Sequence, residues 1–442
     1  MKESEYNLTA IKNDRTILFN SLTGSVLSFA KSEYETITTL IKDVDIMKEK
    51  YPTLFNYFIE KGFVVEDETN ELDIIRFRNN NGIFLDREYR LVLNPTLECN
   101  FNCWYCYEKH DKGRMSKYTM QKIRNHVNFL INKRQIDSLH LDWFGGEPLL
   151  YFEEIVYPMT KYFKERLKKK QVGFRSGITT NGYLVTPEMI NHFKEIDLSF
   201  FQITIDGNKE RHDKVRRHYN TPSYDVIINN INLLCREMEN ISIVLRVNYD
   251  ERTMENDFTK DLEVILKENR HKITIDFQRV WQTIDKKLIS NQWKIKLSSK
   301  VREMGFLYKG LGQFYPYKEN TCYVDRFNHL EINYDGKIYK CTAKGYDDEY
   351  VVGNLKSNGE LIWNKNELCN RFSLATFEND MCLKCKCLPI CMGPCSQKIL
   401  DTKNCSNLDS ICTFKLSEFT IEDYIVDYYE TLIDYKNNLC GE

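Results

Sequence analysis

Short apolar runs alternate with longer amphipathic stretches between residues 86 and 280, and this alternation is the clearest pattern in the chain. Short runs rich in apolar and β-branched residues, bounded by polar turns, predict buried strands. Six such runs are present, at Tyr89–Asn94, Ser138–Trp143, Gly173–Thr179, Leu198–Ile205, Ile241–Val247 and Ile273–Val280. Between them, apolar residues recur at helical spacing in Thr119–Asn132, Phe152–Leu167, Thr186–Glu195, Tyr224–Glu237 and Phe258–Glu268.

Repeated strand–helix units predict an α/β fold with a curved parallel sheet inside and helices outside. The pattern stops near residue 285, so we expect a partial (βα)6 barrel over residues 86–285 rather than a complete eight-unit barrel. Residues 286–320 are polar and aromatic and predict a linker that contains a helix. Residues 414–442 predict a terminal helix whose aromatic stripe we interpret as packing.

Residues 1–85 follow a different pattern, which predicts a small separate domain. Two short apolar runs around a polar break predict a hairpin, two helical stretches follow, and a short strand returns. These elements are Ile17–Asn20, Ser25–Phe29, Ser32–Ile41, Tyr51–Glu60 and Phe63–Val65. Their order is typical of a winged-helix domain. The alternative is an N-terminal extension that only packs against the barrel.

Composition and charge exclude several classes of protein. The chain of 442 residues is 42% hydrophobic and 13% aromatic, enough for a large core. Its 62 basic and 64 acidic residues give a net charge of −2, which argues against a nucleic-acid partner. The first residues lack the apolar core of a signal peptide, and no run reaches the roughly 18 apolar residues of a membrane span. We therefore expect a cytoplasmic protein with no membrane partner.

Fifteen cysteines are many for a cytoplasmic chain, where disulfides are uncommon. Cys99, Cys103 and Cys106, spaced C-x3-C-x2-C, directly follow the first predicted strand. Three thiolates cannot complete the four-cysteine shell of a structural zinc or a plain electron-transfer cluster. On a four-iron cluster they would leave one iron open to a substrate or cosubstrate, so we interpret the loop as catalytic. The alternatives are a zinc site or three unrelated buried thiols.

The spacing, with Tyr105 just before the last cysteine, resembles the signature of the radical S-adenosylmethionine (radical SAM) superfamily. The resemblance implies a [4Fe–4S] cluster on Cys99, Cys103 and Cys106, with SAM chelating the open iron. One-electron cleavage of SAM then gives a 5′-deoxyadenosyl radical that takes a hydrogen atom from the substrate, and the cofactor carries this chemistry. A flavodoxin or ferredoxin-type electron donor is implied as well.

Polar motifs follow several predicted strands, where a barrel places its chemistry. Gly145-Gly146-Glu147-Pro148 follows the second strand, and its two glycines would let the backbone approach a ligand closely. In the superfamily this motif contacts the SAM amino group. The other candidates for the SAM pocket are Tyr105, Thr180, Asn181, Thr204, Asp206 and Arg246.

Arg246 could pair with the SAM carboxylate through two parallel hydrogen bonds. The alternative for each candidate is a turn residue or a buried salt bridge. His212 and Arg216 match a frequent superfamily pattern and are assigned no role.

A second group of cysteines lies in the C-terminal part, at Cys322, Cys341, Cys382, Cys385, Cys391, Cys395, Cys405 and Cys412. Thiolates at this density need a metal to offset their mutual repulsion. The spacing C-x13-G-x4-C, then C-x2-C-x5-C-x3-C, then C resembles the SPASM extension. That extension holds two auxiliary [4Fe–4S] clusters in radical SAM enzymes that act on peptides and proteins. The alternative is two zinc sites.

By this resemblance, a SPASM domain at 321–413 would hold the first auxiliary cluster on Cys322, Cys341 and Cys395. Relatives with a fully ligated first cluster have a further cysteine shortly before the position of Cys322. Here the nearest upstream cysteine is Cys235, so a non-cysteine ligand or an open iron is expected. An open iron could bind a substrate thiolate.

The second auxiliary cluster would use Cys382, Cys385, Cys391 and a late cysteine. We prefer Cys412 to Cys405 for this position because its distance from Cys395 is more typical. The cysteines left over are Cys235, Cys369, Cys387, Cys405 and Cys440. Cys235, alone on an amphipathic helix, is interpreted as a core residue.

Together these motifs predict a peptide maturase that abstracts hydrogen from a ribosomal precursor peptide and installs a carbon–sulfur or carbon–carbon crosslink. The N-terminal domain would capture the leader of that peptide at a sheet edge. A sulfatase maturase, which makes formylglycine, is the alternative, although Thr342 stands where those enzymes usually have an aspartate. A non-catalytic iron–sulfur or zinc interaction protein is the third hypothesis. Glu147, Asp206 and Asp325 are conceivable acid–base groups that the sequence does not rank.

Overall fold

The computed structural model describes all 442 residues except 86, 220, 251–252, 254–256, 281–290, 310–313, 403–407, 418 and 440–442. The chain forms two compact units, each made of segments that are distant in the sequence. Unit 1 contains Met1–Leu85, Gly310–Phe327 and Asn370–Glu442, and unit 2 contains Asp86–Lys309 and Asn328–Cys369. The boundaries expected at residues 85, 285, 320 and 413 stay predictions.

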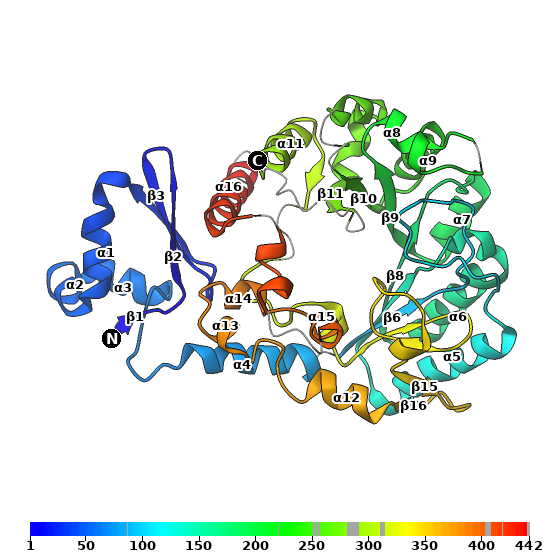
Figure 1. Ribbon diagram of the computed structural model, residues 1–442, viewed down its shortest axis with the longest axis horizontal. Coiled ribbons are helices and arrows are strands. Elements are labelled where there is room, and N and C mark those ends of the chain that lie inside the picture. Colours follow the sequence, from blue (N-terminus) through cyan, green and yellow to red (C-terminus); the bar gives the residue numbers. More distant parts are fainter. Residues whose placement is uncertain are drawn as a thin grey trace. The chain divides into compact units, whose positions relative to one another are not determined.

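Unit 2 is built on one sheet of eleven strands in the order β12-β11-β10-β9-β8-β7-β6-β13-β14-β15-β16. Its long parallel strands are β6 (Glu88–Leu93), β7 (Ser138–Trp143), β8 (Gly173–Thr180), β9 (Leu198–Asp206), β10 (Ser242–Tyr249) and β11 (Ile273–Arg279). All six lie where the apolar runs predicted them. The sheet curves, with helices along its outer side, which confirms the predicted partial α/β barrel (Figure 1).

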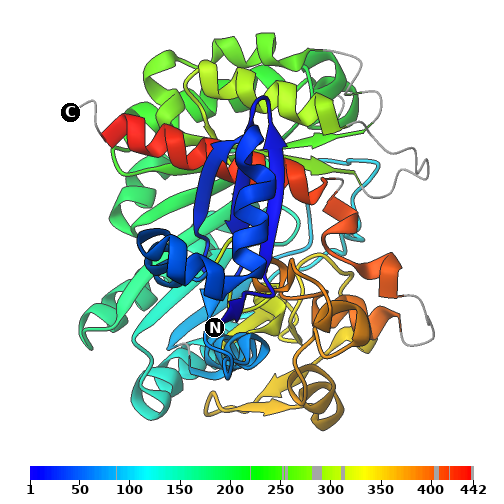
Figure 2. The same cartoon turned by 90° about the vertical axis from the view of Figure 1, so that its left-hand side faces the viewer.

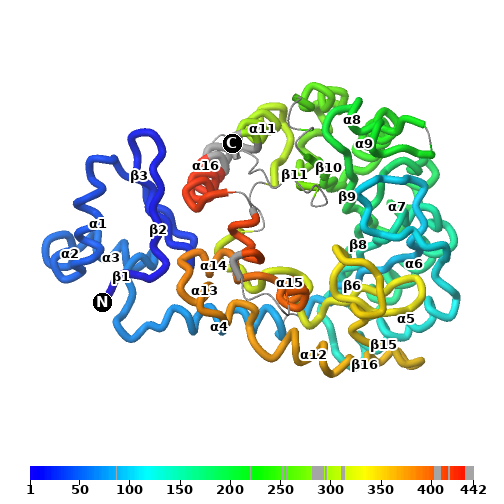
Figure 3. The backbone as a smooth tube through the Cα atoms, viewed as in Figure 1, coloured from blue at the N-terminus to red at the C-terminus, as the bar shows by residue number. Residues whose placement is uncertain are grey.

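The helices of unit 2 follow the predicted amphipathic stretches with one exception. They are α5 (Lys117–Phe129), α6 (Tyr157–Lys168), α7 (Pro187–Glu195) and α9 (Tyr224–Glu237). Helix α8 (Lys209–Val215) was not predicted, and α11 (Asn291–Glu303) lies in the segment expected to be a linker with a helix. The tube view follows α5, α6, α7, α8 and α9 along the outer side of the strands (Figure 3).

The prediction of a helix at Phe258–Glu268 was wrong, because the chain forms two 3-10 segments there, Phe258–Val264 and Lys267–Lys272. Between them the backbone N–H of Leu266 donates to Asn232 Oδ1 on α9 at 3.0 Å. This tertiary hydrogen bond holds Leu266 outside the helix and overrides the helical spacing.

A short strand that the sequence did not predict extends the sheet on the other side of β6. Strand β13 (His329–Ile332) pairs in parallel with β6, so that Glu331 lies opposite Val92. The antiparallel strands β14 (Ile338–Tyr339), β15 (Gly353–Leu355) and β16 (Leu361–Trp363) follow. Strand β12 (Leu307–Tyr308) pairs with β11 at the opposite edge. Part of the segment expected in the cysteine-rich domain therefore completes the barrel sheet.

The core of unit 2 fills the space between the parallel strands and their helices. Leu91, Leu141, Ile203 and Leu245 are fully buried on successive strands. Cys235 on α9 belongs to the same core, as its place on an amphipathic helix predicted. This apolar packing fixes the strands, and their carboxyl ends then carry the polar groups described below.

Unit 1 contains a three-stranded antiparallel sheet with apolar side chains on both faces. Its strands are β2 (Asn7–Lys12), β3 (Arg15–Asn20) and β4 (Val26–Ala30), and β3 with β4 is the predicted hairpin. Leu18 points to one face and packs with α1 (Tyr34–Lys42), α2 (Val44–Lys50) and α3 (Pro52–Glu60), which cover this face in Figure 2. Strand β1 (Lys2–Glu3) pairs with β5 (Val64–Val65), the returning strand.

The other face of this sheet packs against the terminal helix α16 (Ile421–Leu439). Phe19 of β3 lies 5.8 Å from the ring of Tyr424 and 5.3 Å from that of Tyr428, between centroids. The aromatic stripe of the terminal helix is therefore packing, as predicted. No helix among the residues described is both long and apolar enough to span a bilayer.

Candidate active site at the mouth of the barrel

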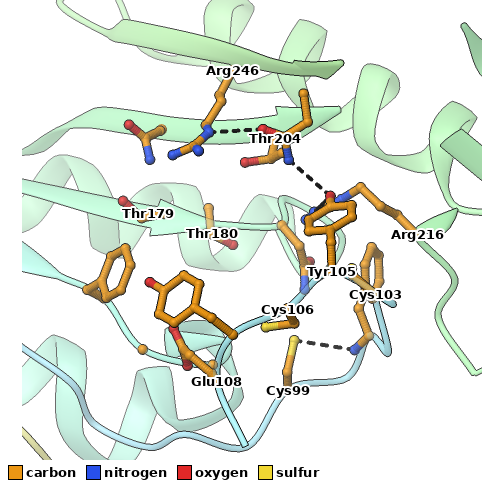
Figure 4. A pocket seen from close by; sticks show the side chains of 18 of the residues that line it. Cys99, Cys103, Tyr105, Cys106, Glu108, Thr179, Thr180, Thr204, Arg216 and Arg246 are labelled. Carbon is orange, nitrogen blue, oxygen red and sulfur yellow. Dashed lines mark hydrogen bonds between the residues drawn. The ribbon is translucent and has the colours of Figure 1, made fainter. Parts of the chain in front are cut away.

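Cys99, Cys103 and Cys106 lie on the loop after β6 and line a cavity of about 170 Å³ at the carboxyl ends of the strands (Figure 4). The loop is held by local hydrogen bonds. The Phe101 backbone N–H donates to Cys99 Sγ at 3.4 Å, and the Cys106 backbone N–H donates to the Cys103 carbonyl at 3.0 Å. The turn therefore brings the three thiols to one wall of the same cavity.

Burial makes these thiols hard to ionise in the protein alone. Burial raises the pKa of Cys99 to about 12 and that of Cys106 to about 11. Burial also raises the pKa of Cys103, while the nearby Arg216 guanidinium opposes the rise. A metal centre binds thiolates, so its positive charge would offset this cost. The donor set therefore fits a resident iron–sulfur cluster.

Tyr105, between the second and third cysteines, is the centre of a hydrogen-bond network. Its hydroxyl donates to Asp206 Oδ1 at 2.8 Å and accepts from Arg216 Nη1 at 2.9 Å and from Asn248 Nδ2 at 3.0 Å. Arg246 Nε donates to Asn248 Oδ1 at 3.0 Å. The network joins the cysteine loop to the ends of β9 and β10, and thus fixes where the loop lies.

Arg216 is the main site residue to which the sequence assigned no role. It is 9% exposed, lines the cavity, and lies 5.7 Å over the Phe101 ring. Burial opposes its charge, but Cys103, Tyr105 and other acceptors raise the pKa of Arg216 well above its usual value. A fixed positive charge therefore lies beside the cysteine loop.

Hydrogen bonds link His212 to Arg216, the two residues to which the sequence analysis assigned no role. The Asp206 backbone N–H donates to His212 Nδ1, so His212 Nε2 carries the proton and donates to Ser223 Oγ at 3.0 Å. Ser223 Oγ in turn donates to the Arg216 carbonyl at 2.5 Å. Burial lowers the pKa of His212 well below its usual value, which keeps the ring neutral for this role. The chain of bonds positions Arg216.

Gly145 and Gly146 line the cavity, but the structure gives a further reason for their lack of side chains. A Cβ on Gly146 would lie 2.2 Å from the Glu98 carbonyl oxygen, and one on Gly145 would lie 2.4 Å from that of Thr96. Gly145 also has a φ of +96°. The two glycines therefore let the loop after β7 pack closely against the backbone of residues 96–98, the segment that leads into the cysteine loop.

Glu147 is completely buried behind the cavity and binds protein groups. Its carboxylate accepts from Thr180 Oγ1 at 2.8 Å, from the Asn181 backbone N–H at 2.8 Å and from the Leu149 backbone N–H at 3.0 Å. Burial raises the pKa of Glu147, and these hydrogen bonds oppose the rise. The carboxylate thus ties the loop after β7 to the end of β8.

The predicted pocket residues divide into two groups. Tyr105, Gly145, Gly146, Thr180, Asn181, Thr204 and Arg246 line the cavity. Glu147, Pro148 and Asp206 are buried behind it. The sequence analysis missed Arg216, Asn248 and Glu108 among the lining residues. Of these, only Arg216 stood in a segment that the sequence singled out.

Glu108 gives the cavity an acidic side, opposite Arg246 in Figure 4. Burial raises its pKa to about 8, and Glu331 of β13 adds to the rise. Burial likewise raises the pKa of Glu331 to about 7, although Tyr346 and Asn94 donate hydrogen bonds to it. Glu108 Oε2 and Glu331 Oε2 accept no hydrogen bond from any described residue. One side of the cavity is therefore cationic and the other acidic.

Unit 1 contains a second group of thiols on short turns. The Cys385 backbone N–H donates to the Cys382 carbonyl, and that of Cys391 donates to the Cys387 carbonyl, both at 3.0 Å. A hydrogen bond from the Cys387 thiol, first among several effects, lowers the pKa of Cys385 to about 6. Burial raises the pKa of Cys391 to about 12, and the buried Lys318 ammonium opposes it.

Cys322 and Cys395 form a second thiol pair in unit 1. A hydrogen bond from the Cys322 thiol lowers the pKa of Cys395 to about 7. Asp325 accepts from the Ser396 backbone N–H at 2.9 Å and so ties the two segments together. Cys341 belongs to unit 2, so its grouping with this pair stays a prediction. Cys405 and Cys440 lie outside the described residues.

No three His, Cys, Asp or Glu side chains in the described part of the chain converge closely enough to hold a single metal ion.

Comparison with known proteins agrees with this geometry. The radical SAM superfamily matches residues 93–259, which contain the cysteine loop and the ends of β7 to β10. The SPASM family, described as an iron–sulfur cluster-binding domain, matches residues 322–387. Both matches come in the order that the two cysteine groups predicted.

Individual relatives are more distant. The radical SAM cyclopropyl synthase TigE of Paramaledivibacter caminithermalis is 28% identical over 44% of this chain, and the chain spans about half of that enzyme, 47%. A cysteine-type anaerobic sulfatase-maturating enzyme of Clostridium novyi is 24% identical over 69% of this chain and 87% of that enzyme.

A solved structure extends the likeness to the fold. Streptococcus suis SuiB bound to precursor peptide SuiA has a TM-score of 0.54 and 15% identity, and the match covers 93% of this chain and 99% of SuiB. At this identity the likeness concerns the fold alone. The cysteine loop, its polar network and both domain matches lead to one conclusion. The chain contains a radical SAM superfamily domain and a SPASM iron–sulfur cluster-binding domain.

Proposed function

We propose that this chain is a peptide maturase that removes hydrogen from a side chain or Cα of a ribosomal precursor peptide and installs a carbon–sulfur or carbon–carbon crosslink. The observation that carries the proposal is the cavity that joins three cysteines to a buried cation and a polar network. The precursor peptide bound to SuiB, whose fold this chain resembles, supports a peptide substrate.

Cys99, Cys103 and Cys106 would hold the SAM-binding cluster. When bound, the cluster and SAM supply a carbon-centred radical that abstracts hydrogen. Gly145 and Gly146 would offer backbone groups to the SAM amino group, and Arg246 would pair with its carboxylate. Thr204 lies directly opposite Arg246 in the strand register and would bind the same part of SAM.

Two auxiliary [4Fe–4S] clusters would complete the cofactor set, three clusters in all. We assign Cys322, Cys341 and Cys395 to the first, and Cys382, Cys385, Cys391 and Cys412 to the second. They would accept the electron that the product radical gives up when the new bond forms. A flavodoxin or ferredoxin would deliver the electron that starts each turnover.

Met1–Leu85 would capture the leader of the precursor peptide. Strand β4 is an edge of its sheet. The backbone N–H of Ala30 donates to Glu33 Oε2 and so points away from β3, and Ser28, two residues earlier, faces the same way. A peptide that pairs with this edge adds a fourth strand. SuiB, which resembles this chain over most of its length, was crystallised with a precursor peptide and supports this reading.

Glu108 would contact the substrate. It lines the cavity on the side away from Arg246 and Arg216, and one of its oxygens accepts no hydrogen bond from the residues described. A buried carboxylate oxygen without a partner is costly, so a donor from the substrate would be bound there. The acid–base candidates from the sequence, Glu147, Asp206 and Asp325, are already engaged by protein groups.

The test is anaerobic reconstitution, followed by reaction with SAM, dithionite and a precursor peptide encoded nearby. The proposal predicts 5′-deoxyadenosine, about twelve irons for three four-iron clusters, and a peptide that has lost two hydrogens in a crosslink. If SAM is cleaved but none of these peptides becomes crosslinked, the peptide part of the proposal would be overturned. Ser28→Pro should weaken peptide binding without changing SAM cleavage, because it removes an outward-facing backbone donor of β4 together with the hydroxyl that accepts from Arg15 Nε.

A sulfatase maturase is the second candidate, favoured by the similarity to the Clostridium novyi enzyme over most of its length. The product separates the two functions. Conversion of a cysteine to formylglycine in a sulfatase-derived peptide would establish this second function in place of crosslinking.

A further inference from the structure

His110 lines the cavity at the barrel mouth, and its ring contacts one of the three cysteines assigned to the cluster. The His110 Nε2 atom lies 3.2 Å from Cys106 Sγ, within hydrogen-bond distance of a sulfur. Cys106 is the last and the most exposed cysteine of the loop. The cysteine spacing ends at Cys106, so the sequence analysis did not single out His110.

The backbone on the N-terminal side of His110 is anchored to another part of unit 2. His110 has a φ of +52°, in the left-handed region that residues other than glycine seldom occupy. The Tyr107 hydroxyl donates to the Thr342 carbonyl, and Lys109 Nζ pairs with Asp347 Oδ1 at 2.5 Å. These contacts fix the turn that directs the His110 ring back toward the cysteine loop.

The chain is fixed again three residues after His110. The Gly113 backbone N–H donates to Glu98 Oε1 at 2.8 Å, and the Gly113 carbonyl accepts from Thr96 Oγ1 at 2.5 Å. Both partners precede the cysteine loop in the sequence. Residues 107–113 are therefore anchored on both sides of His110, and only its two side-chain torsions remain to place the ring.

A cluster on these cysteines would decide the direction of the hydrogen bond. A thiol and an imidazole nitrogen can each donate or accept. A cysteine bound to iron is a thiolate and has no proton to donate. The contact then remains a hydrogen bond only if His110 Nε2 carries the proton and donates to the Cys106 sulfur. Hydrogen bonds to ligand sulfurs are among the factors that set the reduction potential of an iron–sulfur cluster.

We propose that His110 is a positioning residue that donates from Nε2 to the Cys106 sulfur and so raises the reduction potential of the SAM-binding cluster. The inference rests on the proposed function, because it assumes that a cluster binds to this loop. Reduction adds negative charge to the cluster, and a donor to a ligand sulfur stabilises the more negative state. The Phe101 backbone N–H makes a similar contact with Cys99 Sγ at 3.4 Å, but no change of side chain removes that donor. His110 is the donor of this pair that depends on the identity of the residue.

The experiment measures reduction potentials of the reconstituted full chain by redox titration monitored with EPR spectroscopy. His110→Asn is the test variant, because asparagine tolerates a positive φ but its side chain is too short to replace Nε2. His110→Gln is the rescue variant, because its longer side chain can place an N–H donor near the position of Nε2. His271→Asn, at an exposed histidine distant in the sequence, is the matched control. The EPR signal that changes when SAM is added identifies the cluster at the barrel mouth.

All three variants should keep the iron content of wild type. In His110→Asn, the equilibrium constant for one-electron reduction of the SAM-sensitive cluster should fall about tenfold, a downward shift of about 59 mV. His110→Gln should restore the potential toward that of wild type, and His271→Asn should leave it unchanged. An unchanged potential in His110→Asn would overturn the proposal. Loss of cluster iron in His110→Asn would overturn it as well, because a residue that only tunes the cluster is not needed to hold it.

Pulsed EPR of wild-type protein with isotope-labelled histidine gives a second readout that needs no variant to fold. The hydrogen bond should couple a histidine nitrogen to the SAM-sensitive signal, and His110→Gln should abolish this coupling. A wild-type signal without such a coupling would contradict the proposal. A wild-type protein that binds no iron, or whose EPR signals do not respond to SAM, would instead refute the proposed function, so the two failures are distinguishable.

Discussion

The two cysteine regions reach high thiol density by different routes. At the barrel mouth, the three thiols share one loop, but the groups around them come from the ends of β7, β8, β9 and β10 and from the segment after α8. In unit 1, Cys382 to Cys391 follow one another on turns with hydrogen bonds three or four residues apart. The first site gathers its polar groups from distant strands. The thiols of the second site lie on consecutive turns, which pack against distant apolar residues such as Phe19 and Tyr6.

The cations near the two cysteine groups also differ in how they are held in place. Arg216 is held by Tyr105 and by the chain of hydrogen bonds through His212 and Ser223. Lys318 lies 5.8 Å over the rings of Phe314 and Tyr315, close to it in sequence. Substitutions of distant polar groups should therefore damage the barrel-mouth site, whereas the C-terminal site should respond to its own segment and to the apolar residues packed against it.

Loss of one barrel-mouth cysteine gives the largest expected effect. Cys103→Ala leaves two thiols for a cluster that needs three, so 5′-deoxyadenosine formation should fall to the uncatalysed background and about four irons should be lost. Cys387→Ala, the corresponding variant in unit 1, should keep both 5′-deoxyadenosine formation and the iron content of wild type. Chromatography of the nucleoside products and iron analysis measure the contrast. Equal losses of nucleoside formation and of iron in the two variants would contradict the expected difference between the two cysteine regions.

Gly146→Ala tests whether the barrel-mouth site depends on distant segments. The added Cβ meets the backbone carbonyls of Leu97 and Glu98, which cannot move independently of the cysteine loop. Overpacking of this kind costs about 1–3 kcal/mol or more, so the melting temperature and cluster loading should both fall. Gly345→Ala is the control, because its nearest neighbour is the flexible Asp347 carboxylate at 3.3 Å. Unchanged loading in Gly146→Ala would contradict the long-range dependence.

Arg216→Lys separates cation placement from cluster binding. Lysine keeps the charge but lacks the fork that reaches Tyr105, so SAM cleavage should slow about 10- to 100-fold, the usual cost of losing a group that orients a metal ligand. Iron content should stay that of wild type. Arg217→Lys, at the neighbouring exposed arginine, should leave the rate unchanged. A normal rate in Arg216→Lys would mean that charge alone suffices.

Glu108→Gln is expected to act on the substrate side only. SAM cleavage without peptide should be unchanged, whereas crosslinked product per 5′-deoxyadenosine should fall about 10-fold, because the amide NH2 group cannot accept the hydrogen bond that a carboxyl oxygen accepts from the substrate. Glu349→Gln, an exposed glutamate, is the control. Product and nucleoside are quantified in the same reaction by mass spectrometry. A parallel fall of both yields would place Glu108 in SAM binding instead.

The strands and both cysteine groups could be predicted because their signals are local. Apolar runs such as Ser138–Trp143 fix strands by burial, and the cysteine spacings identify turns that can hold a cluster. Strand β13 could not be predicted, because its four residues are too short for a periodic signal and pair with β6 across more than two hundred residues. The helix at Phe258–Glu268 failed because Asn232, on another helix, captures the Leu266 amide.

The interior of the site was only partly predictable. Thr204 and Arg246 could be placed from strand ends, since parallel strands bring their carboxyl ends together. Arg216 lies directly after α8, and its placement depends on Tyr105 and Ser223, which no sequence spacing relates to it. The acidic side formed by Glu108 and Glu331 likewise depends on the pairing of β13 with β6.

The measurement that tests the central claim most directly is SAM cleavage by the reconstituted wild-type protein. Under anaerobic conditions with dithionite, iron-loaded protein should convert SAM to methionine and 5′-deoxyadenosine, and Cys103→Ala should not. If wild type binds zinc in place of iron, or carries its clusters and still leaves SAM intact, the cavity at the barrel mouth is not a radical SAM active site.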